Sequence, residues 1–149
     1  TKSQIRASIL DIGIVPIIRT NSADSAIKAV EAVYRGGIRS AEVTMTVPGA
    51  IKALEKLADA LGDKMTLGAG TVLDPETARA CILAGAQFLV TPALRITTIE
   101  VAHRYSKVIC PGALTPTEVL TAWEAGAAVS YTHLRAHETK ANLVCRLLL

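Results

Sequence analysis

The chain has 149 residues, of which 50% are hydrophobic and only 3% are aromatic. This length predicts one domain, and the composition predicts an aliphatic core of buried parallel strands covered by helices. It excludes a disordered chain, and three cysteines are too few and odd in number for a disulfide scaffold. We find no apolar run long enough to span a bilayer and no secretory signal, so we expect a soluble protein of the reducing cytoplasm.

The formal net charge of +3 is unevenly distributed along the chain. Residues 1–128 carry 13 basic and 12 acidic groups, whereas the last 21 residues add three basic groups and one acidic group. The main body is therefore nearly neutral and has no basic stripe. We expect neither a nucleic-acid nor a membrane partner.

Short β-rich runs alternate with helical patterns along the chain. Their starts are about 19 to 27 residues apart, which is typical of βα units with short loops. A helix over about residues 3–10 precedes the first run. In chain order the runs are 14–19, 41–45, 65–68, 88–91, 108–110 and a weaker one at 127–129.

Capping residues mark where the helices begin. Asp74 followed by Pro75 predicts an N-cap and a first helical position. Residues 97–100 and 115–118 each fit the capping box, in which a threonine is followed three residues later by a glutamate.

Six β-runs alternating with helices predict a parallel sheet, either open and doubly wound or part of a (β/α)8 barrel. Barrel enzymes place their chemistry at the C-terminal ends of the strands, and a barrel typically needs about 250 residues. Functional-looking residues at most strand ends favour the barrel, although only six strands are predicted. These residues are Arg19, 42–44, 70–71, 91–92 and 111–112.

Glu42 is the most informative single residue because it lies in an apolar strand between Ala41 and Val43. A carboxylate facing a barrel interior is costly unless it is paired or functional. Burial would raise its pKa and suit it to proton transfer near neutral pH. Alternatively, Glu42 is a structural acid paired with an arginine or a threonine of a neighbouring strand. Arg19 also has two interpretations, because its guanidinium fits a carboxylate or phosphate of a ligand but could equally pair with Glu42.

Residues 68–71, with the sequence Gly-Ala-Gly-Thr, form a second candidate motif. Small residues let a ligand approach the backbone, and the Thr71 hydroxyl could donate to that ligand. More often, two glycines at a strand end simply form a turn. No two cysteines form a CxxC pair. His133 and His137 are four residues apart and could share a helix face, but two nitrogens do not make a metal site, so we predict neither a metal nor a cofactor.

Four segments together carry a resemblance to a known family: residues 13–19, 42–44, 68–73 and 111–118. In order and spacing they resemble the 2-keto-3-deoxy-6-phosphogluconate / 4-hydroxy-2-oxoglutarate aldolase family over about residues 5–128. The resemblance implies a (β/α)8 TIM barrel, usually a homotrimer. It also implies a metal-free class I aldolase that cleaves a 2-oxo-4-hydroxy acid to pyruvate plus glyceraldehyde 3-phosphate or glyoxylate. Such an enzyme uses a lysine that forms a Schiff base with the substrate.

The resemblance also assigns site residues. It implies that Glu42 relays protons, that Thr71 lies near the pyruvate carboxylate, and that Arg19 lies at the anionic end of the substrate. Thr44 and Pro92 are further expected substrate-binding residues.

Two positions depart from the family pattern. Thr46 stands where many members carry an arginine, within a segment that resembles one branch of the family. Tyr131 stands where the Schiff-base lysine is expected, and a phenol cannot form an imine. We therefore expect the chain as written to be inactive.

The C-terminal segment has a resemblance of its own. Residues 129–139 resemble the conceptual translation of a transposase-type sequencing adaptor, and residues 143–149 match its next constant stretch in the same frame. We expect a partial barrel over 1–128, truncated after about the sixth strand, followed by a non-native tail over 129–149. The alternative is a genuine C-terminal helix, since 136–149 contain good helix formers.

Three functions are thus in competition. The first is the aldolase for the parent protein. The second is another barrel enzyme, a phosphate-binding synthase or epimerase that uses Glu42 as its base. The third is a non-catalytic barrel fragment that serves in binding or assembly.

Overall fold

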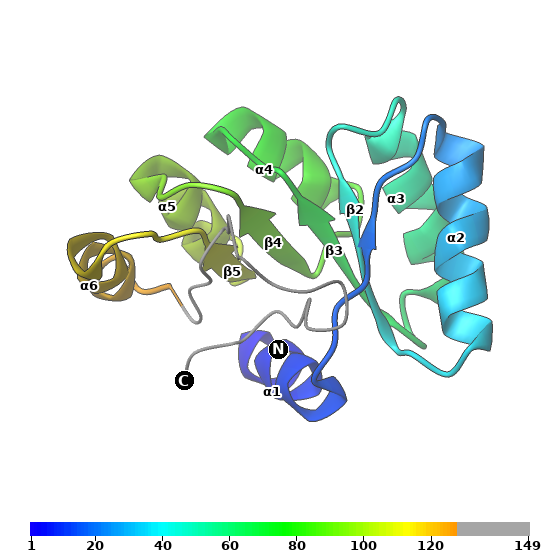
Figure 1. Ribbon diagram of the computed structural model, residues 1–149, viewed down its shortest axis with the longest axis horizontal. Coiled ribbons are helices and arrows are strands. Elements are labelled where there is room, and N and C mark those ends of the chain that lie inside the picture. The colour runs from blue at the N-terminus through cyan, green and yellow to red at the C-terminus, as the bar shows by residue number, and fades with distance from the viewer. Residues whose placement is uncertain (128–149) are drawn as a thin grey trace.

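The computed structural model describes residues 1–127, which form one parallel sheet with helices between its strands (Figure 1). The strands are β1 (Ile17–Ile18), β2 (Ser40–Thr44), β3 (Thr66–Gly70), β4 (Phe88–Thr91) and β5 (Val108–Pro111). The helices are α1 (Lys2–Ile12), α2 (Ala23–Arg35), α3 (Ala50–Leu61), α4 (Pro75–Leu83), α5 (Ile96–Arg104) and α6 (Pro116–Glu124).

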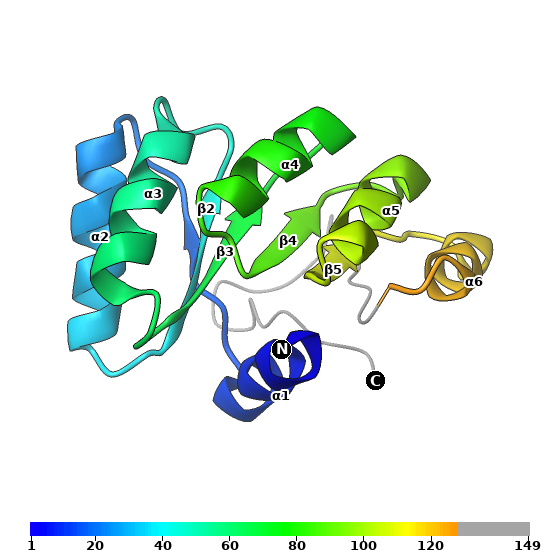
Figure 2. The same ribbon diagram turned by 180° about the vertical axis from the view of Figure 1, so that it is seen from behind.

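The strand order and the side on which the helices lie favour one of the two predicted architectures. The strands are neighbours in sequence order, β1-β2-β3-β4-β5, without a reversal. Helices α2 to α5 all cover the same face of the sheet, as Figure 2 shows from behind. A doubly wound sheet has helices on both faces and a reversal of strand order, whereas a barrel carries its helices only outside. The α/β prediction is confirmed, and the order of the strands is consistent with a segment of a barrel.

Two strand predictions need adjustment. The first run was predicted over 14–19, but only Ile17 and Ile18 pair with β2. Pro16 has no N–H to donate, so its only link to β2 is its carbonyl, which accepts from the Glu42 N–H at 2.9 Å. Of the sixth run, Ala127 is outside any strand, and the other residues lie outside the described part of the chain.

The core lies mainly between the sheet and the helices. It includes Leu54 and Leu57 of α3, Leu67 of β3, Leu89 of β4 and Ile99 of α5, all at most 1% exposed. Aliphatic side chains thus supply this core, as the composition predicted.

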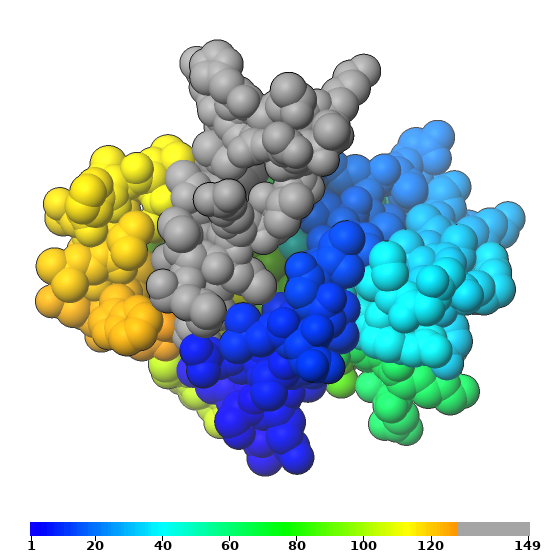
Figure 3. Space-filling view, turned by 60° about the horizontal axis from the view of Figure 1, so that its bottom comes forward, coloured from blue at the N-terminus to red at the C-terminus, as the bar shows by residue number. Residues whose placement is uncertain are grey.

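Helix α1 covers the N-terminal end of the sheet's other face. Ile9 of α1 packs with Phe88, Val108 and Cys110, which face away from helices α2 to α5. The Ser8 hydroxyl lies 3.1 Å from that of Thr66 on β3. Figure 3, with this end turned forward, shows α1 in dark blue as a compact cap.

The helix starts confirm two of the three predicted caps. Asp74 caps α4 by accepting from the Thr77 N–H at 2.6 Å, and Thr115 and Glu118 form the predicted capping box of α6. The capping box over residues 97–100 is wrong, because α5 already begins at Ile96 and has no side-chain cap. Thr98, in the first turn of α5, is completely buried, and its hydroxyl has no hydrogen-bond partner among the described residues. No helix within residues 1–127 is both long and apolar enough to cross a membrane.

Candidate functional site

Glu42 lies in the middle of β2 on the sheet face opposite helices α2 to α5. Its neighbours Ala41 and Val43 point into the helix-side core, so the alternation of the strand directs Glu42 the other way. Its Cα pairs with Ile17 on β1 and with Gly68 on β3. Only 5% of Glu42 is exposed. A carboxyl group is therefore held inside the curved sheet, as the apolar strand predicted.

Glu42 is unpaired within the part of the chain that the structure describes. None of residues 1–127 donates a hydrogen bond to its carboxyl group or forms an ion pair with it. Burial raises the pKa of Glu42 from 4.5 to about 7, and the positive charge of Arg19 acts more weakly in the opposite direction. The interpretation as a paired structural acid is thus not supported. A carboxyl with this pKa exchanges protons at neutral pH.

Arg19 directly follows β1 and is exposed. It lies near enough to Glu42 to lower the pKa of that carboxyl, but the two groups form no ion pair. Its guanidinium therefore has no carboxylate partner among residues 1–127. A guanidinium without a carboxylate partner is able to bind an anionic ligand at the C-terminal ends of the strands.

Thr71 and Thr44 behave differently. Thr71 follows β3, is half-buried and has a φ of 57°, a left-handed conformation that β-branched residues rarely adopt. Such strain clusters at ligand sites. Thr44 is completely buried, and its hydroxyl donates to the Ile18 carbonyl at 3.2 Å and lies 2.8 Å from the Thr46 hydroxyl. Thr44 thus ties β2 to β1, and substrate binding by either threonine stays a prediction.

Pro92 follows β4 at the same end of the sheet and is half-buried. The loops after β4 and β5 pack closely here, since the Gly112 N–H donates to the Thr91 carbonyl at 2.7 Å. A Cβ on Gly112 would lie 2.4 Å from the Pro92 carbonyl oxygen. All five predicted site residues of the described chain are therefore at or near the C-terminal ends of the strands.

Gly68 and Gly70 have a role that neither interpretation of their motif predicted. Both lie inside β3 rather than in a turn, and both are buried. A Cβ on Gly68 would lie 2.2 Å from the Phe88 ring, and a Cβ on Gly70 would lie 1.6 Å from Glu42 Oε1. The glycines thus make room for side chains of the neighbouring strands. The sequence signal for this role was the spacing of the two glycines, which places both on the same face of the strand.

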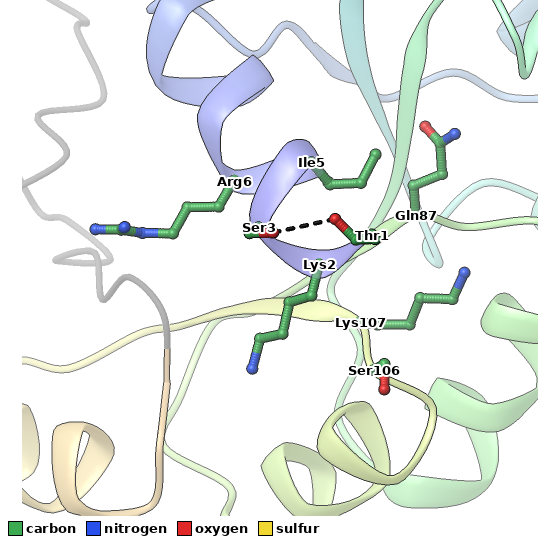
Figure 4. Close-up of a pocket in the computed structure, with 8 residues that line it drawn as sticks. All are labelled: Thr1, Lys2, Ser3, Ile5, Arg6, Gln87, Ser106 and Lys107. Atoms are coloured by element: carbon green, nitrogen blue, oxygen red, sulfur yellow. Dashed lines mark hydrogen bonds between the residues drawn. The ribbon is translucent and has the colours of Figure 1, made fainter.

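The lysines of the described chain are all in helices or in loops that precede a strand. No lysine of residues 1–127 is in a strand or in a loop that follows a strand. Lys107 precedes β5, and Figure 4 shows it with Ser106 and Gln87 beside a hollow at the opposite, N-terminal end. Tyr131, the position expected for the lysine, lies outside the described residues.

Other reactive groups are few in residues 1–127. No three His, Cys, Asp or Glu side chains of this range gather in a group that could hold a metal. Burial raises the pKa of the Cys81 thiol to about 12, and that thiol lies 3.4 Å from the Met45 sulfur, so it is unreactive. The pair His133 and His137 lies outside the described residues.

The fold and the site together define an α/β protein that holds a proton-exchanging carboxyl at the C-terminal ends of parallel strands. The model of the KDPG and KHG aldolase family matches residues 5–133, so the chain belongs to this family. The match ends five residues beyond the predicted boundary at 128.

Two curated relatives from Escherichia coli K12 are informative. The 2-dehydro-3-deoxy-6-phosphogalactonate aldolase is 39% identical over 76% of this chain and 56% of its own length. The KHG/KDPG aldolase is 32% identical over 80% of this chain and 56% of its own length. The chain thus spans about half the length of the curated relatives that it matches.

Solved structures agree with this fold. The native KDPGal structure is 38% identical, with a TM-score of 0.74 over 78% of this chain and 56% of that chain. The KDPG aldolase of Legionella pneumophila, with pyruvate captured as a covalent carbinolamine, is 29% identical. Its TM-score is 0.76, over 85% of this chain and 61% of that chain.

Proposed function

We propose that the parent of this chain is a class I aldolase that forms a Schiff base with a 2-oxo-4-hydroxy acid. Its substrates are 2-keto-3-deoxy-6-phosphogluconate, 4-hydroxy-2-oxoglutarate or both, and its products are pyruvate plus glyceraldehyde 3-phosphate or glyoxylate. The observation that carries the proposal is the buried Glu42 carboxyl, with a pKa of about 7, at the active end of a barrel-type sheet. The pyruvate carbinolamine captured on the Legionella relative supports the same chemistry.

Glu42 would act in two protonation states during this reaction. An amine adds to C2 of the substrate to give a carbinolamine, and protonated Glu42 donates a proton to its hydroxyl, which leaves as water to form the iminium ion. The Glu42 carboxylate then accepts the proton of the C4 hydroxyl. The C3–C4 bond breaks, its electrons move towards the nitrogen to form an enamine, and the aldehyde departs. Protonation at C3 and hydrolysis release pyruvate and the free amine.

We propose further that the chain as written cannot begin this sequence. No lysine of residues 1–127 is in a strand or in a loop that follows a strand, and tyrosine occupies position 131. This fits a partial barrel over 1–128 followed by an adaptor-derived segment over 129–149, in a chain that spans about half of its relatives. Resequencing the source locus tests it: native codons past residue 128 with a lysine codon in place of Tyr131 support the proposal, and an intact segment 129–149 overturns it.

A second candidate substrate is the C4 epimer, 2-keto-3-deoxy-6-phosphogalactonate. The 2-dehydro-3-deoxy-6-phosphogalactonate aldolase shares 39% identity with this chain, against 32% for the KHG/KDPG aldolase. Thr46, where many family members carry arginine, is consistent with a different substrate-binding arrangement. Cleavage rates of the two epimers by the intact gene product decide between them, because the correct epimer should be cleaved at least about tenfold faster, a difference of 1.4 kcal/mol in barrier height.

The aldolase proposal is tested by trapping with pyruvate and borohydride. The imine should be reduced to a stable adduct on the intact gene product, and a variant of that product with arginine in place of the expected lysine is the matched control without the nucleophile. Intact mass spectrometry should show one pyruvyl adduct on the intact product and none on this chain or on the control. An adduct on this chain overturns its assigned inactivity. Absence of an adduct on all three overturns the aldolase and favours a non-catalytic module.

The intact parent is also proposed to be a cofactor-free homotrimer of the cytoplasm. A designed protein cage built by fusing symmetric oligomeric domains is 39% identical to this chain, with a TM-score of 0.72 over 76% of this chain and 42% of that chain. Light scattering after gel filtration of the intact gene product should give three times the monomer mass. A monomeric mass would contradict the trimer and leave the trapping result unaffected.

A further inference from the structure

We propose that Gly70 is a positioning residue for Glu42, because the missing side chain at position 70 is what allows the Glu42 carboxyl to lie over β3 towards the C-terminal end of the sheet. The inference deepens the proposed function, since it rests on Glu42 as the group that moves protons. It adds a role for a residue that touches no substrate itself.

The geometry of β2 and β3 carries this inference. In the register of the two strands, Glu42 pairs with Gly68, while Gly70 pairs with Thr44. The side chain of Glu42 therefore runs diagonally, from its own level to that of a residue two positions further along β3. A Cβ on Gly70 would lie 1.6 Å from Oε1, 2.4 Å from Cδ and 2.8 Å from Cγ of Glu42. These distances are far below van der Waals contact, which is about 3.5 Å.

The backbone gives no separate reason for glycine at position 70. Gly70 is a regular strand residue, and it is not among the residues with positive φ. Glycine weakens a strand, because it has no side chain to pack and loses more conformational freedom on folding. The three atoms nearest to a Cβ on Gly70 all belong to Glu42, whereas at Gly68 they all belong to Phe88. Glu42 is thus the neighbour that requires glycine at position 70.

A methyl group at position 70 would push the carboxyl away from β3. The Glu42 side chain is flexible, so its carboxyl group can turn away from β3 and leave the position in which Glu42 is only 5% exposed. The charged group that acts on Glu42 is Arg19, directly after β1. Towards Glu42, β3 presents Gly68 and Gly70 and is followed by Thr71, none of which titrates. Loss of burial should therefore lower the pKa of Glu42 towards its ordinary value.

The test compares Gly70→Ala with Ala69→Gly in the full chain. The control changes the same strand by one methyl group, but Ala69 faces the helix-side core and is completely buried there. Carbon-13 NMR of the glutamate carboxyls, with the Glu42 signal assigned by Glu42→Gln, gives the midpoint of the Glu42 titration in each variant. We expect this midpoint to fall by at least one pH unit in Gly70→Ala and to stay unchanged in Ala69→Gly. An unchanged midpoint in Gly70→Ala, or an equal shift in both variants, overturns the inference.

A second measurement covers the case in which Gly70→Ala does not fold. In the background of Glu42→Ala, the clash disappears, so adding Gly70→Ala should leave the urea midpoint of unfolding nearly unchanged. If Gly70→Ala lowers that midpoint equally with and without Glu42, or if the double variant also fails to fold, the inference is wrong. Neither measurement uses pyruvate, so failure of the trapping experiment and failure of this inference are separate outcomes.

Discussion

The two faces of β2 and β3 differ in almost every respect, although they are built from alternate residues of the same strands. Towards helices α2 to α5, these strands present Ala41, Val43, Leu67 and Ala69, which are all at most 1% exposed. Towards the inner side they present hydroxyls, glycines and one carboxyl. The inner residues are Ser40, Glu42, Thr44, Thr66, Gly68 and Gly70.

This difference separates stability from chemistry. Aliphatic side chains on the helix face gain free energy by leaving water, and nothing on that face needs a proton donor. On the inner face, burial of the Glu42 carboxyl costs free energy in its charged form, and the resulting pKa near neutrality suits the proton transfer that we propose. Substitutions on the two faces should therefore give different kinds of effect.

The largest effect on stability is expected when a buried side chain on the helix face is shortened. Leu89 of β4 is completely buried in the helix-side core, so Leu89→Ala removes buried methyl groups and leaves a cavity. We expect a loss of about 2–5 kcal/mol in the free energy of unfolding, measured by urea titration followed by circular dichroism. The control is Ile17→Ala on the inner side of β1, where the side chain is 50% exposed and the loss should be much smaller. Equal losses would contradict the division between the faces.

The second-largest effect is expected on the inner face, where Glu42 should make the free energy of unfolding depend on pH. The pKa of Glu42 is about 7 in the folded chain and 4.5 when unperturbed, so the folded state holds its proton more tightly than the unfolded state. Below the unperturbed value, Glu42 is protonated in both the folded and the unfolded state, so its ionisation does not lower the stability. As pH rises towards 7 the unfolded state loses its proton first, and stability falls by about 3 kcal/mol before levelling off.

Glu42→Gln should remove this fall in stability, because glutamine does not titrate. Unfolding free energies of the chain and of Glu42→Gln, measured at a series of pH values from about 4 to about 8, on either side of the shifted pKa, check the prediction. The two curves should converge at the acidic end and separate as pH rises, with the variant more stable. Parallel curves would show that Glu42 is not buried in the way that the structure describes.

Much of the fold was predictable because it depends on local patterns. The alternation of apolar runs with helical patterns predicted the parallel sheet, and Glu42 was recognisable because a carboxylate is out of place between Ala41 and Val43. The predicted extent of β1 was wrong at both ends, since pairing with a neighbouring strand, and not the apolar run, determines where a strand is recognised.

The roles of Gly68 and Gly70 were not predictable in the same way. Each depends on which side chain of an adjacent strand reaches across, and that in turn depends on the register between strands distant in sequence. The ring of Phe88 and the carboxyl of Glu42 become neighbours of these glycines only once β2, β3 and β4 are aligned. Glycines at alternate positions of a strand indicate that space is needed on one face, but they do not show which side chain fills that space.

The smallest effect is expected at the starts of α5 and α6, where similar sequence patterns lead to different contacts. Thr115 and Thr97 both begin a capping-box pattern, yet only the Thr115 hydroxyl accepts a backbone N–H, that of Glu118 at 3.2 Å. Thr115→Ala should therefore cost about 1 kcal/mol of unfolding free energy, the typical value of an N-cap. Thr97→Ala should cost less than about 0.5 kcal/mol, because Thr97 is an exposed residue inside the first turn of α5. Urea titrations of the two variants check both values. Equal costs would show that the pattern alone decides capping, whereas in the structure α5 begins one residue before Thr97 and only α6 has the cap.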